Sequence, residues 1–127
     1  MKIQSVCDAV LGILNETDVE TVENYTDRIS HLSAMFCCFA ASADRDFRET
    51  RGLPSQSAFD PVCLTPEDDF PLDDRFLVPA AYYIASMLLL MDNERKSENL
   101  FSMFNDSMSA IKNEIPLQKG KTVNVYP

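Results

Sequence analysis

The sequence predicts a mainly α-helical protein, a bundle of about four helices with a long irregular loop and a short C-terminal strand. Residues 71–115 carry the strongest signal, an almost wholly apolar segment followed, after a short polar turn, by an amphipathic one. Apolar residues at three- and four-residue spacing over 18–50 predict a further long helical region. At 127 residues, the chain is expected to form a single domain with one hydrophobic core.

Four successive regions make up this expected domain. They are N-terminal helices over 1–51, an acidic, proline-rich loop over 52–74, a helical hairpin over 75–115 and a tail over 116–127. The first helix is predicted over 2–14, because Ile3, Val6, Val10 and Ile13 recur at helical spacing.

The second helical region is expected to bury one apolar stripe. Its members are Val22, Tyr25, Ile29, Leu32, Phe36, Phe39 and Ala43, with Met35, Cys38 and Phe47 widening the stripe. Either one continuous helix or a helix broken near 42–44 fits this pattern. The helix is expected to end by Gly52, because glycine is favoured just past a helix C-terminus and Pro54 follows.

Prolines interrupt the region 52–74 and predict an irregular loop. Residues 58–65 could form a short extended piece or an edge strand between the prolines. The loop is also rich in aspartate and glutamate, so a calcium site is one alternative. The acid spacing does not match an EF-hand loop and the glycine that such a loop requires is missing, so a solvated acidic loop is preferred.

The predicted hairpin begins with a helix over 78–91 that is apolar on nearly every side. Such a helix is expected to be buried completely, in the core or between subunits. Pro79 suits its first turn, and Asp73 or Asp74 suits a capping position before it.

The second helix of the hairpin is predicted over 94–115 and ends before Pro116. Its expected buried stripe is Leu100, Phe104, Met108, Ile111 and Ile115, with Phe101 and Met103 on the flanks.

The tail contains an alternating segment, 122–126, that predicts a strand. A lone strand is not stable, so this one must pair with 58–65 or with another chain. The loop and the tail therefore supply the predicted assembly contacts, which are Phe59, Val62, Leu64, Val123, Val125 and Tyr126.

We expect no enzymatic activity, no cofactor and no metal site. The sequence contains no HExxH, no GxSxG and no glycine-rich phosphate loop. A dyad of His31 with Cys7 or Cys37 is the catalytic alternative, but a lone helical histidine more often has a structural role. The four cysteines lack CxxC spacing and are expected to be buried thiols in a reducing cytoplasm.

Charge and hydropathy exclude two classes of partner. The formal net charge of −9 argues against specific nucleic-acid binding, which needs a basic face. The longest apolar run, 76–91, is shorter than the roughly 20 apolar residues of a spanning helix, so no membrane segment is expected.

Several features of residues 65–126 together resemble a known protein family. They are an acidic, proline-containing loop, the entry Pro-Leu-Asp-Asp-Arg-Phe, the helix Ala-Ala-Tyr-Tyr-Ile-Ala-Ser-Met-Leu-Leu, a second helix with spaced aromatics and the segment Val-Asn-Val-Tyr. This pattern is similar to that of small helical proteins that tailed bacteriophages and prophages encode near their portal and capsid genes, the head–tail connector or head-completion proteins. The N-terminal helices match only in outline.

The resemblance implies a structural role in virion assembly. It implies a homo-oligomer that forms a ring on assembly, contacts the portal and the tail or stopper proteins, and lets DNA pass through an acidic lumen. The protein would lie in the bacterial host cytoplasm during assembly and in the virion neck afterwards. The alternative is a small cytoplasmic helical adaptor or regulatory domain that binds a partner through a Met- and Phe-rich surface. An enzyme that uses His31 ranks last.

Overall fold

The computed structural model describes residues 1–15, 19–55 and 64–114. Within them the chain forms four α-helices, which confirms the predicted helical fold: α1 (Ile3–Leu14), α2 (Val19–Arg51), α3 (Leu77–Leu89) and α4 (Glu94–Asn113), with a 3-10 turn over Asp74–Phe76. The described residues contain no strand, apart from an isolated antiparallel bridge between Lys2 and Asp69. The predicted strand over 122–126 lies outside them.

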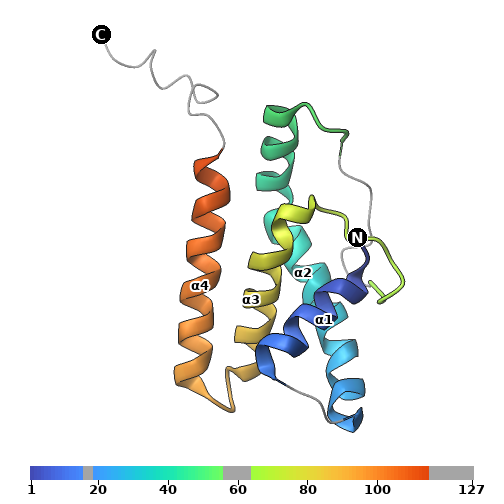
Figure 1. The fold of residues 1–127 in the computed structure, drawn as a ribbon, viewed down its shortest axis with the longest axis vertical. Helices are drawn as coiled ribbons and strands as arrows, with labels where there is room; N and C mark the ends of the chain where they lie inside the picture. Colours follow the sequence, from blue (N-terminus) through green and yellow to red (C-terminus); the bar gives the residue numbers. More distant parts are fainter. Residues whose placement is uncertain (16–18, 56–63, 115–127) are drawn as a thin grey trace.

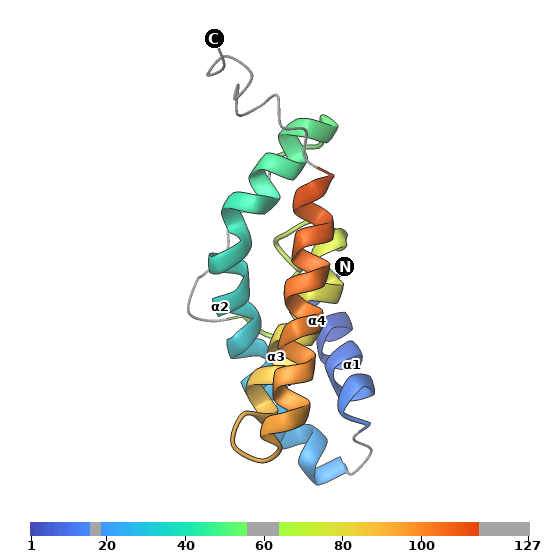
Figure 2. The ribbon, with the colours of Figure 1, turned by 90° about the vertical axis from the view of Figure 1, so that its left-hand side faces the viewer.

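Helix α3 lies at the centre of the fold, between α4 on one side and α1 and α2 on the other (Figures 1 and 2). α2 and α4 run in the same direction on the two sides of α3, which runs the opposite way (Figure 1). α4 packs chiefly on α3. No helix that the structure describes has both the length and the apolar character needed to cross a bilayer.

Helix α3 is buried along most of its length, but not on every side. Ile84 and Ala85 are fully buried and Leu88 nearly so, whereas Val78 is 51% exposed in the first turn. The helix ends at Leu89, and Leu90 and Met91 are exposed in the turn that follows. Within the single chain the burial expected over 78–91 is therefore incomplete at both ends, and the alternative that other subunits cover these side chains stays a prediction.

A reciprocal pair of hydrogen bonds joins α3 to α4. Ser86 Oγ donates to the carbonyl oxygen of Ser97 at 3.0 Å, and Ser97 Oγ donates to the carbonyl oxygen of Ser86 at 2.8 Å. Both serines are buried, so each hydroxyl needs a partner inside the protein. Small side chains at these two positions let the helices approach closely while both hydroxyls are satisfied.

The loop before α3 closes the N-terminus of α1. The backbone N–H of Ile3 donates to the carbonyl of Asp68 at 2.9 Å, and that of Gln4 donates to Pro66 at 3.0 Å. These bonds satisfy N–H groups that have no partner within a helix, and Lys2 supplies no side-chain cap. The side chains of Leu64, Phe70 and Leu72 enter the core, while Glu67, Asp68 and Asp69 are exposed. The described part of the loop is thus fixed to α1, with its acids toward solvent.

Helix α2 is continuous through 42–44, so the alternative of a break there is wrong. It ends before Gly52, whose φ of +68° is the left-handed conformation that glycine adopts most readily. The predicted stripe is wrong in part: Ile29, Phe36 and Phe47 are buried, but Phe39, Met35 and Cys38 are exposed. The buried face consists instead of Ile29, Ser33, Phe36, Cys37, Ala40, Asp44 and Phe47. Small and hydrogen-bonded residues face the core because α1, α3 and the loop approach this side of α2 closely.

The burial of α3 gives a direct test of the fold. We expect Ile84→Asp to lower the free energy of unfolding by more than about 4 kcal/mol, because Ile84 is fully buried and the new carboxylate would have no partner. Val78→Asp is the matched control on the same helix and should cost less than about 1 kcal/mol. Circular dichroism during thermal unfolding measures both. A soluble Ile84→Asp protein with an unchanged melting temperature would contradict the central position of α3.

Candidate interaction surface

Exposed apolar side chains gather where α2 and α4 flank α3. Phe39 is 63% exposed, Met35 45% and Phe101 42%, all unusually high for side chains of this kind. We call this the α2–α4 surface and define it by the exposed residues Met35, Phe39 and Ser42 of α2 and Phe101 of α4. A contiguous exposed apolar patch commonly marks a site where another protein binds.

Phe104 joins the two helices beneath this surface. Its buried ring lies 6.1 Å from the ring of Phe39, 5.4 Å from that of Phe101 and 5.3 Å from that of Tyr83, measured between centroids. Phe36 packs edge-on against it at 6.2 Å. The exposed rings therefore rest on a rigid aromatic cluster that belongs to the core, which fixes their positions before any partner arrives.

Charge is absent from a long stretch of this surface. The sequence carries no Asp, Glu, Lys or Arg from Ile29 to Ala43, although 24% of the whole chain is charged. The exposed positions of α2 in that stretch are His31, Met35, Cys38, Phe39 and Ser42. Protein interfaces show this composition at their centres, where charged residues are depleted and aromatic residues and methionine are enriched.

A shallow open cleft of about 280 Å³ continues the surface toward the C-terminal ends of the two helices. Its lining residues are Phe39, Ser42, Ala43, Asp46, Met108 and Lys112. One acid and one base thus stand at the end of an otherwise uncharged surface, so a partner must match both signs there.

Of the six predicted assembly contacts, the structure describes only Leu64. Leu64 belongs to the hydrophobic core and is 7% exposed. Phe59, Val62, Val123, Val125 and Tyr126 lie outside the described residues, and their role as contacts stays a prediction.

Sequence reasoning missed the α2–α4 surface, because 3-4 spacing assigned Phe39 to the core. The uncharged stretch from Ile29 to Ala43 is the sequence signal that could have revealed it.

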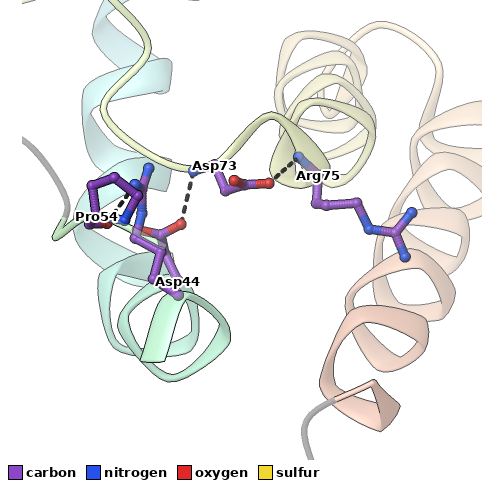
Figure 3. A network of polar contacts seen from close by, with 5 residues as sticks. Asp44, Pro54, Asp73 and Arg75 are labelled. Atoms are coloured by element: carbon purple, nitrogen blue, oxygen red, sulfur yellow. Dashed lines mark hydrogen bonds and ion pairs between the residues drawn. The ribbon is translucent and has the colours of Figure 1, made fainter. Parts of the chain in front are cut away.

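A buried carboxylate anchors the loop to α2 (Figure 3). Asp44 is fully buried and accepts a hydrogen bond from the Arg48 Nε at 2.9 Å and from the Asp73 backbone N–H at 2.7 Å. Arg48 Nη1 donates to the Pro54 carbonyl at 3.0 Å. The Asp73 carboxylate accepts from the Arg75 backbone N–H at 3.0 Å and so caps the 3-10 turn, whereas α3, for which an aspartate cap was predicted, begins without a side-chain cap. Two paired charged residues of α2, Asp44 and Arg48, thereby hold the two described ends of the loop.

A second polar group fixes the end of α4. Glu114 pairs with Arg51, at the end of α2, at 2.9 Å and also with Arg75, in the 3-10 turn. All three side chains are partly exposed, so the ion pairs contribute little energy individually. Their effect is positional, because they hold the last described residue beside the end of α2.

The alternative of a histidine–cysteine dyad would join residues in different environments. Cys7 and Cys37 are buried, as expected, whereas His31 is exposed on α2. Cys38 is exposed, so the expectation of burial is wrong there, and Cys63 lies outside the described residues. Burial raises the pKa of the Cys37 thiol to about 12 and also raises that of Cys7. Both groups therefore stay protonated at neutral pH, the form that is a poor nucleophile.

The Asp44 contacts predict unequal effects for two substitutions. Asp44→Ala should lower the free energy of unfolding by about 3 kcal/mol, because it leaves Arg48 and the Asp73 N–H without their buried acceptor. Asp44→Asn keeps an acceptor for the N–H but loses the charge, so its cost should be smaller. Asp27→Ala removes an exposed carboxylate from the same helix and should change stability by less than about 0.5 kcal/mol. Urea unfolding compares the three variants, and equal values for all of them would contradict the anchoring role of Asp44.

The thiols should differ in reactivity. At pH 8 iodoacetamide is expected to modify Cys38 in the folded protein and to modify Cys7 and Cys37 only after unfolding. Above pH 9.0, the ordinary thiol value, the unfolded chain loses the Cys37 proton that the folded chain keeps until about pH 12. The free energy of unfolding should therefore fall as pH rises through that window. Peptide mass spectrometry locates the modified thiols, and rapid modification of Cys37 in the folded protein would contradict its burial.

Comparison of the chain with protein-family models, with curated proteins and with solved structures gave no significant match.

Proposed function

We propose that this protein is a non-enzymatic structural assembly protein of a tailed phage or prophage, a head–tail connector that oligomerises between portal and tail. The pattern of residues 65–126 suggests this role, and one structural observation supports an assembly function. Aromatic side chains are exposed on two helices whose positions the core fixes, and on α2 they lie in a stretch without Asp, Glu, Lys or Arg. Such a surface suits the binding of other protein chains.

The proposal assigns further contacts to the loop and the tail. Phe59 and Val62 would be presented by a loop whose described ends are anchored by Asp44 and Arg48. The tail would leave α4 beside the end of α2, because Glu114 pairs with Arg51 there. We propose that 122–126 forms a strand that pairs with 58–65 or with a neighbouring copy, and that Val123, Val125 and Tyr126 make the contacts.

Net charge is compatible with this role. A chain of charge −9 placed around a passage would present an acidic lumen, which does not retain DNA phosphates. The protein would act in the host cytoplasm during assembly and remain in the virion neck, without specific nucleic-acid binding.

A second candidate is a small cytoplasmic helical adaptor or regulatory domain. The same exposed surface favours it, because Met and Phe side chains on a rigid helical scaffold bind many kinds of partner. Only the connector proposal requires the protein for joining heads to tails, so the two roles make different genetic predictions.

Removal of the gene from the phage or prophage should leave heads that fail to join tails, because a connector links the two. Electron microscopy of the particles counts tailed and tailless heads. The full chain supplied from a plasmid should restore tailed particles. A chain that lacks 118–127 should fold normally, but the number of tailed particles should be lower by a factor of about ten or more. The double variant Val123→Asp, Val125→Asp should fail in the same way, and Lys119→Ala with Lys121→Ala is the matched control that should succeed.

Two outcomes would contradict the proposal at different points. Normal numbers of tailed particles without the gene would exclude the connector role and favour the adaptor. Full restoration by the truncated chain would keep the connector role but remove the tail as an assembly contact.

A further inference from the structure

We infer that two copies of this chain pair face to face through the α2–α4 surface, in a twofold arrangement with the two copies of α2 antiparallel. The inference concerns the isolated chain and does not rest on a role in phage assembly. A twofold contact closes at two copies, so by itself it builds no ring.

Net charge restricts where two copies can meet. Each copy carries −9, so contact through an ordinary part of its surface brings like charges together and costs free energy. The stretch from Ile29 to Ala43 avoids this cost, because it contains no Asp, Glu, Lys or Arg. The α2–α4 surface combines that property with the exposed rings of Phe39 and Phe101, whose burial favours association.

The charges at the two ends of this face on α2 are opposite in sign. Arg28 and Asp46 are eighteen residues apart, which is five helical turns, so both lie on the same face of α2 about 27 Å from one another. Met35, Phe39 and Ser42 lie between them on that face. A helix with a base at one end and an acid at the other is electrostatically complementary to an antiparallel copy of itself.

Helix α4 repeats the arrangement with the signs exchanged. Glu94 and Lys112 are also eighteen residues apart, with the exposed Phe101 between them on the same face and the exposed Glu98 at its edge. Lys112 and Asp46 line one cleft, which places the C-terminal ends of the two faces at the same level. Arg28, Glu94 and Lys112 are exposed and Asp46 is partly exposed, so a second copy can reach these charges.

One twofold axis satisfies all of these groups. An axis midway between Arg28 and Asp46 places Arg28 opposite Asp46 of the second copy and Met35 opposite Phe39 of the second copy. Sulfur–aromatic contacts of this kind are favourable. The same axis places Glu94 opposite Lys112 of the second copy, because the two faces have equal length and lie at the same level.

The size of the face predicts a weak pair. Two helices, each about 10 Å wide, over about 27 Å give roughly 500 Å² per copy and roughly 1,000 Å² in total, the lower limit for a specific interface. Pairing should therefore depend on protein concentration and weaken as salt screens the end charges.

Sedimentation equilibrium of the full chain from about 5 to about 500 µM tests the contact. The mass should rise from the monomer value of 14.3 kDa toward twice that value. Phe39→Glu and, separately, Met35→Glu should hold it at the monomer value over the whole range. Met103→Glu is the matched control, since it adds the same charge at a 48% exposed methionine about 200° around α4 from Phe101. This control should pair like the unchanged chain.

Charge reversal tests the antiparallel arrangement. Arg28→Glu and Asp46→Arg should each weaken pairing at least about tenfold, and the double variant Arg28→Glu, Asp46→Arg should restore it, because each new charge meets its opposite in the second copy. Three results would each overturn the inference. The unchanged chain could be monomeric at 500 µM, Met35→Glu could pair as strongly as the unchanged chain, or the double variant could pair no better than either single variant. Circular dichroism checks that every variant is folded, and Arg28 and Met35 are exposed enough for substitution without loss of the core.

Discussion

The burial of α3 is the constraint on which the other elements depend. This helix can be covered only if α1, α2 and α4 surround it, and the loop before it must then cross the N-terminus of α1. The large side chains of Ile84 and Leu88 are removed from water in this way, each contributing roughly 1.5–3 kcal/mol, and the buried alanines contribute less. The reciprocal serine bonds between α3 and α4 keep the two helices close without an unsatisfied hydroxyl.

Polar contacts then decide where the ends of the chain segments lie. Asp44 is a costly group to bury, and it is retained because the Arg48 guanidinium and the Asp73 N–H satisfy its carboxylate. Glu114 forms ion pairs with Arg51 and Arg75 in the same way, but these side chains are partly exposed and the pairs are weaker. Both groups act on segments that lead to the proposed assembly contacts. A rigid helical core can therefore present a loop and a tail from defined places, which is what an assembly protein requires.

The α2–α4 surface connects packing to association. Phe39 and Phe101 rest on Phe104, so the energy that fixes their positions comes from the core and need not be supplied by a partner. Their exposure is unfavourable for the isolated chain and becomes favourable once another surface covers them. The opposite charges at the ends of each helix add orientation, because they favour one way of laying two such faces together.

The helical spacing of apolar residues and the positions of proline and glycine were sufficient to predict the four helices. They also predicted that Pro79 lies in the first turn of α3 and that α2 ends before Gly52, because each feature depends on residues close in the chain. The buried face of α2 could not be predicted in the same way. Spacing assigned Phe39 to the core, whereas the approach of α1, α3 and the loop selected the face with Ser33, Ala40 and Asp44. Only tertiary structure could decide this, since the amphipathic pattern of α2 admits more than one apolar face and the choice depends on which side its neighbours leave uncovered. The same choice brought Phe39 of α2 against Phe104 of α4, which also contacts Phe101, and so created the candidate surface.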